Sequence, residues 1–251
     1  MSTSTPERHA RDGLSVPGGW PGPFDPALAA DLPAPARRWL THAIAPGTPL
    51  FGGVRLEMHG RIRIGSWWPF TATQVLRPAS GFVWAARARV AHLPVTGFDR
   101  YAAGEGEMRW RLLGTVPVMS GGGPDITRSA AGRLAGELML VPGAALSPFV
   151  TWEPLDDEHA VARVTVGAWT HRVTIGVAPS GALTSVRMPR WGNPDRGGAF
   201  REHEFGAVVH REASSGGFTI PSIVSAGWWP CTERWGEGEF IRFVVDGFAH
   251  F

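Results

Sequence analysis

Lysine is absent from the 251-residue chain, so all 24 of its basic residues are arginines, set against 22 acids. Arginine binds phosphate well through its forked guanidinium, but here the arginines are scattered among the acids and form no basic block. Codon bias in a GC-rich genome accounts for the missing lysine. The composition therefore predicts no nucleic-acid partner.

Cysteine is nearly absent, since Cys231 is the only one, and no disulfide can form within the chain. A reducing compartment fits this usage. Residues 1–22 contain no apolar core of a secretory signal, and no run of 18 apolar residues occurs anywhere. We expect a cytoplasmic protein without a membrane span. The sequence does not indicate an oligomeric state.

Tyrosine occurs once, as Tyr101, whereas tryptophan occurs 12 times. A buried tryptophan removes about 150–250 Å² from water, which corresponds to roughly 4–6 kcal/mol before entropy is subtracted. So many rings can fill an ordinary core or line a cavity. Both interpretations stay open.

Most of the chain alternates apolar and polar residues with a period of two, which is typical of β-strands. Residues 54–64 alternate over eleven positions, and about eleven such segments are joined by short turns. Neighbouring strands joined by short turns run antiparallel, and so many strands need closure to protect their edges. We predict a mainly β protein, an antiparallel β-barrel or half-barrel of about 10–12 strands with two short helices at 32–44 and 124–138.

The N-terminal residues differ in composition from the rest of the chain. Residues 1–26 are rich in proline and glycine, which predicts a flexible arm. Residues 27–251 contain no repeat and no linker, so we expect them to form a single β-rich domain that binds a ligand.

Five short motifs resemble an uncharacterised family of bacterial domains of unknown function. They lie at residues 32–40, 106–114, 129–137, 190–194 and 226–229 and include GEMRWRLLG, SAAGRLAGE, RWGNP and AGWW. The resemblance implies a family but no activity. At the level of fold alone, the expected barrel is similar to lipocalin-like barrels, which hold apolar ligands, and some barrels in natural-product pathways fold polyenes into cyclised products.

Metal and cofactor chemistry have little support in the sequence. His203, Glu204 and His210 lie on one expected strand without a spaced set of further ligands, and Cys231 stands alone. No G-x-S-x-G elbow occurs, and a chain without lysine has no Walker motif. We expect no metal and no cofactor.

A group of alternating charges is a candidate polar site. Glu105, Glu107, Arg109 and Arg111 project from one face of an expected strand. If that face points to solvent, these residues form a salt-bridge ladder; if it points into a barrel, a buried glutamate there is an acid or base with a raised pKa. The candidate catalytic residues are Glu107, Tyr101 and Arg190.

The tryptophans give the clearest functional indication, because they lie on separate strands. A curled sheet brings separate strands to one concave face, where broad rings suit a mainly hydrocarbon ligand. Ordinary core is the alternative. The expected ligand-binding residues are Trp84, Met108, Trp110, Trp152, Trp191 and Trp228.

Three functions are compatible with such a pocket. The first is a cofactor-independent cyclase or isomerase of a polyketide- or terpenoid-like natural product, which holds the substrate in a reactive fold. The second is a non-catalytic carrier or sensor of a lipid-like ligand, and the third is a structural or interaction domain. The missing signal slightly favours the enzyme. A lone polar group inside an apolar cavity distinguishes the first two, because a carrier needs none.

Overall fold

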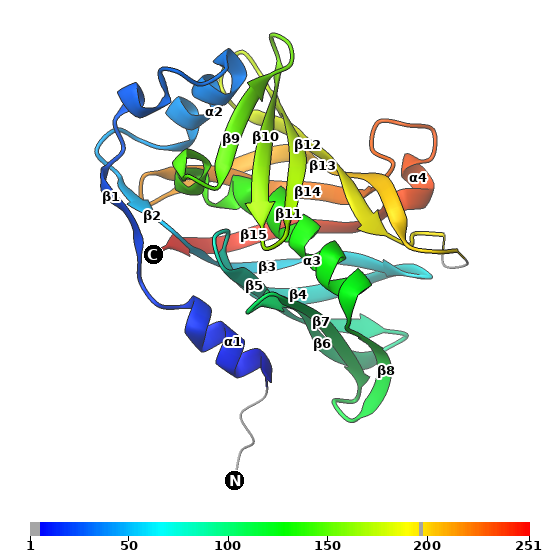
Figure 1. Ribbon diagram of the computed structural model, residues 1–251. Helices are drawn as coiled ribbons and strands as arrows, with labels where there is room; N and C mark the ends of the chain where they lie inside the picture. Colours follow the sequence, from blue (N-terminus) through cyan, green and yellow to red (C-terminus); the bar gives the residue numbers. More distant parts are fainter. Residues whose placement is uncertain (1–5, 196–197) are drawn as a thin grey trace.

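A single antiparallel sheet of 13 strands dominates the computed structural model, which describes residues 6–195 and 198–251. Its strand order is β8-β7-β6-β5-β4-β3-β15-β14-β13-β12-β11-β10-β9. The sheet curls so that its two halves face each other (Figure 1). The prediction of a mainly β, antiparallel half-barrel is confirmed.

The two halves are consecutive along the chain. The first consists of β3 (Val54–Ile64), β4 (Ser66–Arg77), β5 (Gly81–Val90), β6 (Leu93–Ala102), β7 (Glu105–Leu112) and β8 (Val116–Gly121). The second consists of β9 (Val150–Pro154), β10 (His159–Val166), β11 (Trp169–Val177), β12 (Leu183–Gly192), β13 (Arg201–Ser215) and β14 (Phe218–Trp228). The last strand, β15 (Glu239–His250), joins them by pairing with β3 and β14.

The sequence alternation determines which side chains point inward. In β3, Val54 and Leu56 are buried, whereas the intervening Arg55 and Glu57 are exposed. Leu56 lies opposite Gln74 of β4 in the antiparallel register, so both face the inside of the half-barrel. The hydrophobic core thus lies on the concave face, and charged residues cover much of the convex face.

Helix α3 (Pro124–Gly136) crosses the inside of the half-barrel between its two halves (Figure 1). It packs mainly on β12 and β7, and also on β10, β11 and β6. Two short 3-10 helices, η2 (Glu137–Leu140) and η3 (Pro142–Leu146), continue its path. Gly132 lets α3 lie close to the sheet, because a Cβ there would be 3.2 Å from Cγ of Arg190.

The helix predicted at residues 32–44 is also present, as α2 (Ala34–Ala43). The 3-10 helix η1 (Pro26–Ala29) precedes it. The structure adds two helices that the alternation did not predict, α1 (Pro6–Leu14) and α4 (Trp235–Gly238). Within the described residues, no helix combines the length and the apolar character needed to cross a membrane.

Residues 6–26, the described part of the expected flexible arm, contain regular structure, while residues 1–5 lie outside the described part. Leu14 of α1 is buried in a small cluster with Val75, Val83 and Phe251. Strand β1 (Gly19–Pro23) pairs with β2 (Pro49–Phe51) in a separate two-stranded sheet. A Cβ at Gly19 would collide with the Leu50 carbonyl, so this glycine serves close strand approach rather than flexibility.

Candidate functional site

Charged side chains gather inside the half-barrel, on the concave face that apolar residues otherwise fill. Arg133 of α3 lies at their centre: its Nη1 is 3.3 Å from Asp99 Oδ2, and its Nε donates to Glu137 Oε1 at 2.7 Å. Gln74 donates to the other Glu137 oxygen at 2.5 Å, and the Trp110 indole donates to Asp99 Oδ1 at 3.0 Å. Both carboxylates are therefore held from two sides.

Aromatic rings surround this cluster. The Arg133 guanidinium lies 4.5 Å from the centre of the Phe82 ring and 5.3 Å from that of Trp84. Burial raises the pKa of Asp99, although the Arg133 charge and the Trp110 hydrogen bond act in the opposite direction. The surroundings of Asp99 are thus apolar enough to penalise its charge despite the ion pair.

Arg190 of β12 lies across α3 from that ion pair. Its Nε donates to the Ser129 carbonyl at 3.2 Å, and its guanidinium lies 4.5 Å from the Phe205 ring centre and 5.5 Å from that of Trp228. Burial, and secondarily the Arg133 charge, lower the pKa of Arg190 to about 10. Among the described residues no acid forms an ion pair with Arg190, so its charge lacks a direct counter-ion.

A second unsatisfied group lies beside Arg190. His171 of β11 packs over Gly132, and its Nε2 is buried without a hydrogen-bond partner among the described residues. Burial, together with the charges of Arg128 and Arg190, lowers the pKa of His171 to about 4. This imidazole is therefore neutral at neutral pH.

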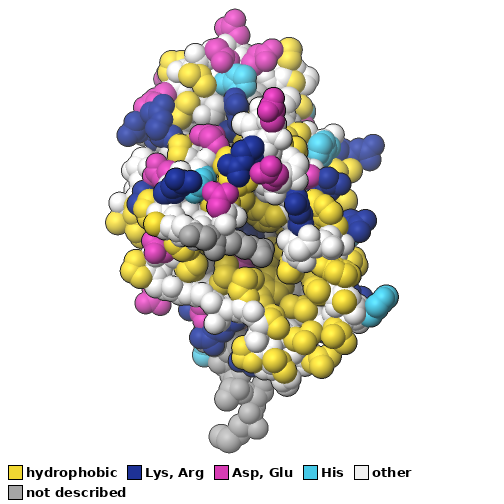
Figure 2. Space-filling view, turned by 90° about the vertical axis from the view of Figure 1, so that its right-hand side faces the viewer, with side chains coloured by type: hydrophobic (Ala, Val, Ile, Leu, Met, Phe, Trp, Pro, Cys, Tyr) yellow, Lys and Arg dark blue, Asp and Glu magenta, His cyan; other side chains and the backbone are white. Residues whose placement is uncertain are grey.

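The concave face is incompletely covered at the end away from η2. The side chains there are half-buried rather than buried, and they come from five strands: Ile62, Met108, Phe205, Trp228, Ile241 and Phe243. Figure 2 shows hydrophobic side chains gathered around a hollow on this end of the molecule. An apolar surface thus remains open next to Arg190.

The structure places the predicted tryptophans in four settings. Trp84 and Trp110 are core residues, 3% and 5% exposed, with ring centres 5.7 Å apart. Trp228 and the predicted Met108 contribute to the open apolar surface. Trp152 donates to the Ala145 carbonyl and packs on Trp39, away from the charged cluster.

Trp191 lies at the end of β12, against the first turn of α3. Its indole donates to Asp125 at 2.8 Å, and the Arg128 guanidinium lies 3.9 Å from its ring centre. These contacts fix the entry of α3 into the half-barrel. The ring therefore has a positioning contact in the fold rather than a place in the open surface.

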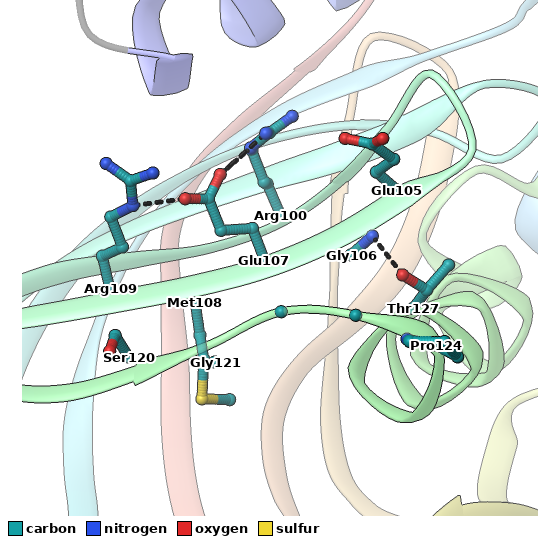
Figure 3. A pocket seen from close by; sticks show the side chains of 12 residues that line it. Arg100, Glu105, Gly106, Glu107, Met108, Arg109, Ser120, Gly121, Pro124 and Thr127 are labelled. Carbon is teal, nitrogen blue, oxygen red and sulfur yellow. Dashed lines mark hydrogen bonds and ion pairs between the residues drawn. The ribbon is translucent and has the colours of Figure 1, made fainter.

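The structure does not bring Glu107 to this site. Glu107 lies on the opposite face of β7 from Met108 and Trp110, paired with Arg100 at 2.7 Å and also with Arg109. Figure 3 shows Glu107 with Arg100 and Arg109 at a shallow pocket beside the start of α3. The pocket has a volume of about 950 Å³. Glu107 therefore does not point to the concave face, and its pairing matches the alternative of a salt-bridge ladder.

Tyr101 points inward but is covered. It is 4% exposed, and burial raises the pKa of its phenol. Its hydroxyl lies against Gly167, where an added Cβ would be 2.8 Å away. Of the three candidate catalytic residues, Arg190 alone borders the open apolar surface.

Several members of the cluster were missing from the predicted site. Arg133 of α3 and Glu137, the first residue of η2, stand four residues apart, a spacing that brings opposite charges together in a helix and was visible in the sequence. Gln74 and His171 gave no such signal, because they reach the cluster only through the curling of the sheet. No group of three His, Cys, Asp or Glu side chains in the described part of the chain could hold a metal ion.

Comparison with known proteins gives one family and several remote structures. The model of a family of unknown function (DUF6544) matches residues 22–239. No curated protein matches the sequence. The chain is similar to a LolA superfamily protein from Nitrosomonas europaea, with 10% identity, a TM-score of 0.44, and coverage of 86% of this chain and 93% of that one.

Two further structures show comparable similarity. A domain from Vibrio parahaemolyticus, described as that of an outer membrane lipoprotein-sorting protein, is 8% identical with a TM-score of 0.41, covering 79% of this chain and 85% of that one. A DUF1329 family protein from Desulfovibrio piger is 13% identical with a TM-score of 0.35, covering 90% and 94%.

Proposed function

The chain belongs to this family of unknown function (DUF6544), as its motifs indicated, and we propose that it binds an amphiphilic molecule, a mainly apolar body with an anionic group, as a carrier or sensor. The observation that carries the proposal is Arg190, a half-buried residue whose guanidinium has no acidic partner among the described residues and lies beside an open apolar surface. The ligand would supply the missing negative charge.

The apolar part of the ligand would lie on the half-buried side chains of the concave face. Phe205 and Trp228 pack edge to face, with ring centres 5.2 Å apart, and form the part of this surface nearest Arg190. Met108 contributes from the opposite wall. A ligand that covers such apolar surface gains about 25 cal/mol of binding free energy for each Å² removed from water.

The anionic group would bind the free donors of Arg190. A guanidinium has five N–H donors in a planar fork that matches a carboxylate. Arg190 Nε donates to the Ser129 carbonyl at 3.2 Å, and Nη2 approaches the Ser129 hydroxyl at 3.5 Å. Unused N–H donors therefore remain on both terminal nitrogens. Arg133 is less suited to this role, because Asp99 and Glu137 already pair with it.

The same geometry supports binding more than catalysis. Cyclisation or isomerisation needs a group that gives or takes a proton. Arg190, with a pKa lowered only to about 10, keeps its proton at neutral pH, and Arg133 holds the two nearest carboxylates. A cyclase would have to use Asp99, whose pKa is raised by burial but whose oxygens both have partners.

Calorimetric titration with laurate and with 1-dodecanol tests the proposal, because the two probes share a chain and differ in charge. We expect laurate to bind more tightly, and Arg190→Gln to weaken laurate about 10- to 100-fold, since a charge-assisted hydrogen bond is worth about 1.5–3 kcal/mol. Dodecanol affinity should change little. Arg187→Gln is the matched control, because this arginine lies on the same strand with its side chain on the other face.

Two outcomes would contradict the proposal. If neither probe binds the delipidated protein, the concave face is not a site for amphiphiles. If Arg190→Gln and Arg187→Gln affect laurate equally, Arg190 does not hold the anionic group.

A further inference from the structure

Three hairpins project from the same end of the sheet. The β3–β4, β5–β6 and β7–β8 turns lie at one end because each intervening strand reverses direction. This end carries six of the nine large hydrophobic side chains that are exposed in the described part of the chain. They are Ile64 (41%), Leu93 (46%), Leu113 (57%), Val116 (53%), Val118 (52%) and Met119 (48%).

Exposed apolar residues at this density are unusual unless something covers them. These exposed residues do not come from a single strand, because three separate hairpins contribute them. Two half-buried tryptophans, Trp67 and Trp68, begin β4 at the first of these turns, where the Trp68 indole donates to the Ile64 carbonyl at 3.1 Å. Figure 2 shows that the hydrophobic side chains of this end reach the rim of the hollow.

Near their tips, these hairpins carry charge of one sign only. Residues 58–98 and 108–124 contain no aspartate or glutamate. Arg87, Arg89 and Arg111 lie near the tips, are exposed, and form no ion pair with an acid of the described residues. Arg63 donates to the backbone carbonyls of Gly236, Glu237 and Glu239. The apolar tips are thus bordered by unpaired positive charge.

We propose that this end of the half-barrel docks on an anionic lipid surface. The tips of the three hairpins enter the interfacial region, the tryptophans lie at headgroup depth, and Arg87, Arg89 and Arg111 face the lipid phosphates. A second copy of the chain fits this end poorly, since a symmetric pair would bring arginines against arginines. The docking surface is separate from Arg190, so the proposal does not depend on the ligand.

Flotation with vesicles tests the proposal on the full chain. We expect binding to vesicles of phosphatidylcholine with phosphatidylserine, weak binding to phosphatidylcholine alone, and loss of binding as salt rises. Arg89→Gln with Arg111→Gln should reduce partitioning about 25-fold, since each arginine contributes about fivefold, or about 1 kcal/mol, near an anionic surface.

The apolar contribution is tested by Val116→Glu, with Leu155→Glu as the matched control. Leu155 is 56% exposed but lies between β9 and β10, outside the three hairpins. Val116→Glu should abolish flotation, and Leu155→Glu should leave it unchanged. Both substitutions are at exposed positions, and unchanged tryptophan emission of the free proteins verifies the fold.

Three outcomes would overturn the proposal. They are no flotation with phosphatidylserine vesicles, equal effects of Val116→Glu and Leu155→Glu, and a dimer in light scattering that Val116→Glu dissociates. The last outcome would identify a second copy as the occupant. Laurate binding is measured without vesicles, so failure here and failure of the ligand proposal are distinguishable.

Discussion

Replacement of Arg133 by methionine is the sharpest test of the charged cluster inside the half-barrel. The substitution keeps an apolar chain of similar length against Phe82 and removes the guanidinium that pairs with Asp99 and Glu137. Two carboxylates then remain on a mostly apolar face with one neutral donor each, from Trp110 and Gln74. Uncompensated buried charge is what makes such a change costly.

At neutral pH we expect the free energy of unfolding to fall by about 3 kcal/mol, the lower end of the range for breaking a buried ion pair. The lower end applies because the Asp99 and Glu137 side chains are 24% and 21% exposed. Without the guanidinium the pKa of Asp99, which burial already raises, rises further, so the folded variant takes up a proton before the unfolded chain does. The stability deficit should therefore shrink as pH falls from neutral towards about 5.

Urea unfolding followed by tryptophan emission measures both quantities. The triple variant Asp99→Asn, Arg133→Met, Glu137→Gln is the matched control, since it removes all three charges together, and it should recover most of the lost stability. A single variant as stable as the wild type, or a triple variant as unstable as the single one, would refute the account of the cluster as a mutually neutralising set.

The remaining predictions concern packing and pH. Trp110→Ala should cost about 3–5 kcal/mol in urea unfolding, because the ring is 5% exposed; an unchanged unfolding midpoint would contradict its place in the core. Gly97→Ala should cost about 1–3 kcal/mol in the same assay, because the added Cβ would meet the Trp110 ring and the Arg109 carbonyl. Burial lowers the pKa of His171 from 6.5 to about 4, so on acidification the unfolded chain takes up the proton first and stability is lost between these values. His171→Phe should flatten that part of the melting-temperature profile, and an unaltered slope would exclude this histidine as its source.

The sequence was informative about the strands and less so about the ends of the chain. Alternation in residues 54–64 reports burial on one face, and this local signal is what β3 shows. The proline and glycine content of residues 6–26 says nothing about distant partners. Leu14 lies in a buried cluster with Phe251, which is the last residue of the chain.

The site was harder to predict because it depends on which alternate side chains of each strand point inward and on how distant strands pair. Alternation alone already puts the Glu107 side chain on the other face of its strand from Met108 and Trp110. Which of the two faces is inside follows from the curl of the sheet. Asp99 joins the site because the β6–β7 register sets it beside Met108, and Arg190 because β12 passes under α3.

Helix α3 connects the two walls through different chemistry on each side. Arg133 binds the β4–β6 wall through ion pairs with Asp99 and with Glu137, which Gln74 also holds. Ser129, one turn earlier, binds the β12 wall by accepting from Arg190. An anion on the free terminal donors of Arg190 would bind the same guanidinium that holds Ser129, while the Arg133 contacts would be untouched. Binding would therefore act on α3 from one side only, which gives a sensor or carrier a route from ligand to helix position.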